Sequence, residues 1–94
     1  MSSQETTRQV RVQILNKFGL HARPAAEFVK LASTFRSDIR VQKDDLEVNG
    51  KSIMGVMMLA AESGSEILIQ ASGEDADEAV AALSALVQSR FGES

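Results

Sequence analysis

The spacing of hydrophobic residues switches repeatedly along this chain, and the order of the switches restricts the possible folds more than any other feature. Alternating apolar residues predict four strands, over 10–14, 39–42, 46–48 and 66–71. Apolar residues spaced by three and four predict helices over 22–35, 52–61 and 76–90. The predicted order is therefore β-α-β-β-α-β-α.

A right-handed crossover through the first helix makes the first two strands parallel and leaves a gap between them. The fourth strand can fill this gap antiparallel to both neighbours. We therefore predict an α+β fold, an open-faced β-sandwich in which a four-stranded antiparallel sheet carries three helices on one face. The polar residues 1–8 are predicted to be a flexible leader to a single domain over 9–94.

Three local signals support the predicted helix ends. Pro24 is compatible with a helix because it falls in the first turn. Ser52 is predicted to cap the second helix. Asp75 and Glu78 have the spacing of a capping box, which predicts that the Asp75 carboxylate caps the third helix. The apolar side of the first helix is expected to contain Ala22, Ala25, Ala26, Phe28, Val29, Ala32 and Phe35.

Composition excludes several classes of function. The chain has no Cys, one His and a net charge of −3, so we predict no disulfide, metal site or nucleic-acid binding. Its apolar runs are too short to span a membrane, and its polar start lacks the features of a signal peptide. These features together predict a cytoplasmic protein.

The single histidine, His21, lies where the first strand gives way to the first helix, within the segment Gly-Leu-His-Ala-Arg-Pro-Ala. Free backbone N–H groups and the helix dipole make such a position an anion site, and they favour the neutral imidazole that can act as a nucleophile. A phosphoryl group on His21 could accept hydrogen bonds from the backbone of Ala22 and Arg23, while the Arg23 guanidinium suits phosphate. The same position also fits a surface residue, a helix cap or a simple anion site.

That segment resembles the active-site motif of HPr, the histidine-containing phosphocarrier family of the bacterial phosphoenolpyruvate-dependent phosphotransferase system. The segment Asn-Gly-Lys-Ser-Ile-Met-Gly-Val-Met, over 49–57, resembles the regulatory-serine segment of the same family. The resemblance implies that the δ nitrogen of His21 accepts a phosphoryl group from Enzyme I and that Arg23 is the active-site arginine. It further implies transfer to a IIA protein or domain of a sugar permease, by a monomeric relay that needs no cofactor and is not an enzyme.

Ser52 has two interpretations, a simple helix cap or a regulatory phosphorylation site. The resemblance implies that an HPr kinase/phosphorylase modifies Ser52, that phosphoserine slows acceptance at the histidine, and that in some bacteria it creates a co-repressor for a catabolite-control protein.

The predicted second helix has more apolar residues than one buried stripe needs. Its surplus residues are either buried or form an exposed docking patch, and the resemblance favours docking. The patch is expected to contain Ile53, Met54 and Met57, extended by Leu20 beside the histidine.

Four basic residues, Lys17, Arg23, Lys30 and Lys51, either surround His21 and steer acidic partners or are scattered over a solvated face. Two further functions remain open, a nitrogen-type regulatory phosphocarrier and an interaction module without covalent chemistry.

Overall fold

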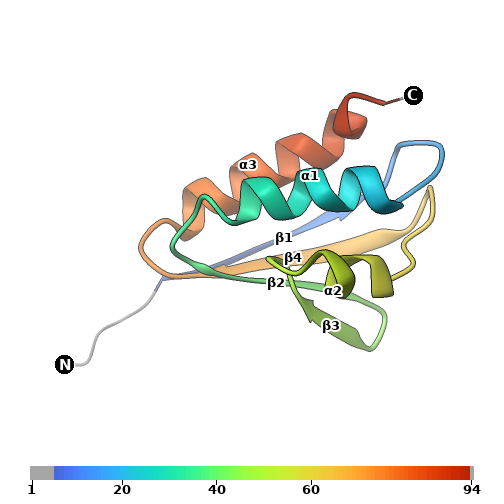
Figure 1. Ribbon diagram of the computed structural model, residues 1–94. Coiled ribbons are helices and arrows are strands. Elements are labelled where there is room, and N and C mark those ends of the chain that lie inside the picture. The colour runs from blue at the N-terminus through green and yellow to red at the C-terminus, as the bar shows by residue number, and fades with distance from the viewer. Residues whose placement is uncertain (1–5, 94) are drawn as a thin grey trace.

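The computed structural model describes residues 6–93 and contains the predicted elements in the predicted order (Figure 1). The strands are β1 (Thr7–Gln13), β2 (Asp38–Lys43), β3 (Leu46–Asn49) and β4 (Glu66–Ser72). The helices are α1 (Ala22–Ala32), α2 (Ile53–Met58), α3 (Ala76–Gln88) and a terminal 3₁₀ turn, η1 (Arg90–Gly92). Thr7 and Arg8 belong to β1, so the predicted leader extended too far, and residues 1–5 lie outside the described residues.

The sheet has the order β1-β4-β2-β3, and every neighbouring pair is antiparallel. Strand β4 fills the gap between β1 and β2, where Val10 and Val41 both pair with Ile69. Helices α1 and α3 lie along one side of the sheet in Figure 1, and α2 packs against α1. The predicted open-faced sandwich is therefore confirmed.

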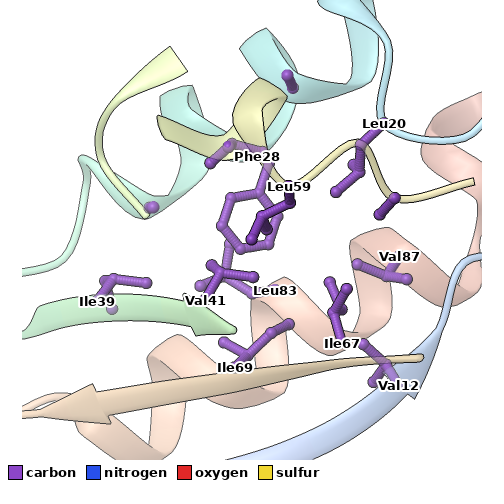
Figure 2. Packing of buried hydrophobic residues seen from close by; sticks show 14 of the residues in the cluster. Val12, Leu20, Phe28, Ile39, Val41, Leu59, Ile67, Ile69, Leu83 and Val87 are labelled. Carbon is purple, nitrogen blue, oxygen red and sulfur yellow. The ribbon is translucent and has the colours of Figure 1, made fainter. Parts of the chain in front are cut away.

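The core lies between the helices and the sheet. Phe28 of α1 is completely buried, and Figure 2 shows its ring surrounded by Leu59, Val41 and Leu83. Strand side chains alternate between buried and exposed, as the spacing predicted. Helix α1 buries most of its predicted apolar side, with two exceptions, because Ala22 and Ala26 are exposed.

Helix α2 is shorter than predicted. It ends at Met58, and Ala60 then adopts a left-handed backbone conformation with φ of 49°, which an α-helix cannot continue through. The turn directs the chain into the segment before β4, and Leu59 and Ala61 still contribute buried side chains.

The predicted capping box before α3 is wrong. The Asp75 carboxylate makes no cap hydrogen bond and instead accepts three from the segment after α1. The donors are the Arg36 N–H at 2.8 Å, the Ser37 N–H at 3.0 Å and the Ser37 hydroxyl at 2.6 Å. Asp75 therefore connects two loops that are distant in sequence. These bonds, led by that from the Ser37 hydroxyl, hold the pKa of the Asp75 carboxyl below its ordinary value of 3.8.

We predict that Asp75→Asn lowers the free energy of unfolding at pH 7, because a neutral amide oxygen cannot replace both carboxylate oxygens as acceptors. A carboxyl group with a lowered pKa in the folded state stabilises the fold above its unfolded pKa, and this stabilisation is lost as the pH falls through the folded value. The stability difference between the two proteins should therefore shrink below about pH 4.

Urea unfolding of both proteins across pH 2 to 7 measures this difference, with Asp45→Asn in the exposed β2–β3 turn as the matched control. A difference between wild type and Asp75→Asn that stays constant over the whole pH range would contradict the assignment.

Candidate functional site

His21 is the N-cap residue of α1, with an extended backbone conformation (φ −74°, ψ −175°). Its carbonyl accepts the first helical hydrogen bond from the Ala25 N–H at 3.0 Å, whereas its side chain makes no cap hydrogen bond. The first N–H groups of the helix, including those of Ala22 and Arg23, have no intrahelical partner by geometry. An exposed imidazole thus lies beside an anion-binding helix end, with 41% of its side chain open to solvent.

The loop before His21 is fixed by close packing of its backbone. Gly19 has a φ of +68°, and a side chain there would collide with the Ala61 carbonyl and approach Glu62 Cα to 2.9 Å. The Leu20 N–H donates to the same Ala61 carbonyl at 2.8 Å. The Leu20 side chain is buried in the core, where Figure 2 shows it among the cluster residues. The prediction that Leu20 extends the docking patch is therefore wrong.

Two neighbours of the His21 ring, Phe18 and Glu93, were not predicted from the sequence. The Phe18 ring stands edge-on to the imidazole, with ring centroids 6.1 Å apart, and is 71% exposed. Glu93 Oε1 lies 3.2 Å from His21 Nε2. Phe18 had a usable signal, an apolar residue in a polar turn, whereas Glu93 is 72 residues away with no motif to connect it.

A hollow of about 400 Å³ adjoins the histidine. Its lining consists of Lys17, Phe18, His21, Arg23, Gly92 and Glu93. Lys17 and Arg23 therefore lie beside His21, as one interpretation of the sequence predicted. Their two positive charges border the position where an anion would bind at the start of α1.

The other two predicted basic residues do not line this hollow. Lys30 lines a separate hollow with Glu27 and Leu86. The Lys51 ammonium donates a hydrogen bond to the Phe35 carbonyl at 2.7 Å and so connects the start of α2 to the segment after α1. Of the four basic residues considered, only Lys17 and Arg23 border His21.

Ser52 caps α2, as predicted. Its hydroxyl oxygen accepts a hydrogen bond from the Gly55 N–H at 3.0 Å, and its side chain is partly exposed. A group added to this oxygen would lie at the positive end of α2 and next to the exposed side chains of that helix.

The surplus apolar residues of α2 are exposed. Ile53, Met54, Met57 and Met58 have 44%, 75%, 41% and 65% of their surfaces open to solvent, whereas Val56 is buried. We name these four exposed residues the α2 patch. Their burial, one of the two interpretations of the sequence, is therefore wrong, and a flexible, methionine-rich surface is what adaptable protein contacts use.

Within residues 6–93, no helix is both long and apolar enough to cross a bilayer, and no cluster of three or more metal-ligating side chains occurs.

Comparison with known proteins identifies the family. A family model described as "PTS HPr component phosphorylation site" matches residues 8–89. The chain belongs to the HPr family. It is 50% identical over 82 residues to the phosphocarrier protein HPr of Neisseria meningitidis, a match that covers 87% of this chain and 92% of the relative. The role of this family, phosphoryl carriage in the phosphotransferase system, agrees with the resemblance found in the sequence.

Solved structures of HPr relatives share the fold. A crystal structure of HPr from Thermoanaerobacter tengcongensis matches with a TM-score of 0.89 at 50% identity, covering 93% of this chain and 98% of that chain. A crystal structure of the catabolite-repression protein Crh from Bacillus subtilis matches with a TM-score of 0.72 at 46% identity, covering 96% and 97% of the two chains. That Crh structure is described as a domain-swapped dimer, so the monomeric state of the present chain stays a prediction.

Proposed function

We propose that this chain is a cytoplasmic phosphocarrier that accepts a phosphoryl group on Nδ1 of His21 from Enzyme I and passes it to IIA proteins or domains of sugar permeases. The observation that carries the proposal is the exposed imidazole at the start of α1, bordered by Arg23, in a chain of the HPr family. It is a stoichiometric relay rather than an enzyme, and it uses no cofactor.

The chemistry follows from the position of the ring. Nδ1 attacks phosphorus with its lone pair while the donor's bond to phosphorus breaks and its electron pair returns to the donor. The transferred oxygens would accept hydrogen bonds from the Ala22 and Arg23 backbone N–H groups and from the Arg23 guanidinium. Because the ring is partly exposed, the group remains accessible to the next acceptor.

Partner docking is the second part of the proposal. The exposed Ile53, Met54 and Met57, with Met58 completing the α2 patch, offer apolar contacts on a helix that packs against the histidine-bearing α1. Lys17 and Arg23 add positive charge next to His21, which would attract acidic partner surfaces.

Ser52 would regulate the relay. A phosphoryl group from an HPr kinase/phosphorylase adds about −1.5 to −2 charges at pH 7 next to the α2 patch. Such a charge repels a partner that is itself acidic, and it creates a new anionic surface that a catabolite-control protein could read. The similarity of this chain to Crh, a relative named for catabolite repression, supports this regulatory role.

We predict that His21→Ala folds normally and accepts no phosphoryl group, because the exposed ring supports no core contact and no second histidine exists. Incubation with phosphoenolpyruvate and Enzyme I, followed by intact-protein mass measurement, should show one acid-labile phosphoryl group on the wild type and none on the variant. Ser52→Ala, which keeps His21, is the matched control and should be labelled like the wild type. Label on His21→Ala would rule out the assignment.

We predict that Ser52→Asp keeps or slightly raises stability and weakens Enzyme I binding. A negative group at a helix N-terminus is worth roughly 0.3–1 kcal/mol, whereas Ser52→Ala loses the cap at a cost of about 1 kcal/mol. Initial rates of His21 phosphorylation against carrier concentration should show a higher KM for Ser52→Asp and an unchanged KM for Ser52→Ala.

The rise in KM should diminish with added salt, since repulsion between exposed charges is screened. Superimposable curves for the Asp and Ala variants at low salt would leave Ser52 as a helix cap only.

A further inference from the structure

The C-terminal end of the chain returns to the active site through a turn that ordinary residues seldom form. Arg90 and Phe91 have φ values of 61° and 55°, in the left-handed region that bulky residues rarely adopt. The Phe91 side chain is nonetheless buried, and the Glu93 N–H donates to the Arg90 carbonyl at 2.7 Å. Figure 1 shows this end of the chain near the loop that joins β1 to α1. Strained backbone that is held by packing tends to occur at functional sites.

The result of this turn is a carboxylate placed between the His21 ring and the buried Asn16 amide. Glu93 Oε1 lies 3.2 Å from His21 Nε2 and accepts a hydrogen bond from Asn16 Nδ2 at 3.1 Å. Asn16 is completely buried, and the same amide nitrogen donates to the Gly19 carbonyl at 2.7 Å. Only 14% of the Glu93 side chain is exposed, and both of these contacts are made by its Oε1.

The Asn16 amide nitrogen makes two hydrogen bonds, whereas its amide oxygen makes none within residues 6–93. Among the described residues, Asn16 Oδ1 is buried without a hydrogen-bond partner. Turning the amide over would satisfy neither the Gly19 carbonyl nor Glu93, because both are acceptors. A buried polar atom left unpaired costs stability, so the orientation serves the two acceptors rather than the amide itself.

We infer that Glu93 is a positioning residue, anchored by Asn16, that holds the proton of the His21 ring on Nε2 and leaves the lone pair of Nδ1 free for phosphorus. A carboxylate can only accept, so its contact with a neutral imidazole is a hydrogen bond only when Nε2 carries the proton. This inference rests on the proposed function for its kinetic consequence and on the geometry alone for its structural one.

Glu93 also stabilises charge during transfer. When Nδ1 forms its bond to phosphorus, the ring keeps the Nε2 proton and becomes positively charged. The Glu93 carboxylate then faces the charged side of the ring, opposite the nitrogen that carries the phosphoryl oxygens. A charge-assisted hydrogen bond of this kind is stronger than one to a neutral acceptor, so it strengthens as the reaction proceeds.

The test compares wild type, Glu93→Gln and Glu93→Ala, with Glu74→Gln as the matched loss of one exposed carboxylate in an ion pair with Arg36. Nitrogen-15 shifts of the His21 ring are recorded at a pH where the ring is neutral, without any partner protein. The wild type and Glu74→Gln should show the well-separated shifts of the Nε2–H tautomer. Glu93→Ala should bring the two shifts closer together, and identical shifts in all proteins would overturn the inference.

Phosphorylation by Enzyme I and phosphoenolpyruvate is the second measurement. We expect Glu93→Gln to lower kcat about fivefold with little change in KM, as expected when a charged acceptor becomes neutral, and Glu74→Gln to leave both unchanged. If the wild type is labelled and Glu93→Gln reacts equally fast, the inference fails while the proposed function stands. If the wild type accepts no phosphoryl group, the proposed function fails, and the ring shifts still decide whether Glu93 sets the tautomer.

Discussion

The position of His21 depends on a backbone contact between the loop before α1 and the segment after α2. Gly19 packs against Ala61 and Glu62 where no other residue has room, and the Leu20 N–H binds the Ala61 carbonyl. This contact fixes where α1 begins and therefore which residue occupies its N-cap. The buried Leu20 side chain anchors the same loop in the core. His21, the next residue, is therefore held at the surface at the start of α1.

The same contact connects the two regions that the proposed function uses, the His21 loop and the α2 helix. It connects the loop that carries His21 to the chain leaving the helix that carries the α2 patch and Ser52. Phe28, at the centre of the core, packs with Leu59 from that same segment (Figure 2). The proposed phosphoryl acceptor and the proposed docking surface are therefore connected through packed, hydrogen-bonded segments, which suits a relay that must present both to each partner in turn.

Periodicity was sufficient to predict the sheet and its helices because each element's pattern is local. Alternation at Val10 and Val12 or at Ile39 and Val41 needs only one face to be buried, and topology rules then order the strands. Ser52 was equally predictable, because a cap acts within its own turn. The role of Asp75 was not predictable, because the groups that donate hydrogen bonds to its carboxylate belong to a loop about 38 residues away.

The active-site errors have the same origin. A leucine beside an exposed histidine fits either surface or core, and only the packing against Ala61 decides that Leu20 is buried. Glu93 reaches His21 through left-handed residues that no propensity scale favours, so neither its position nor its role could be read from spacing. The motifs were sufficient to propose His21 as the nucleophile, whereas the residues around its ring required the three-dimensional structure.

The central claim is that phosphoryl transfer occurs at one nitrogen of His21. Phosphorus and nitrogen-15 NMR of the chain after incubation with Enzyme I and phosphoenolpyruvate tests it most directly. The account predicts one phosphorus resonance coupled to Nδ1 of His21, with large shifts of the Ala22 and Arg23 backbone amides. A phosphoryl group on Nε2, or on any other residue, would contradict it.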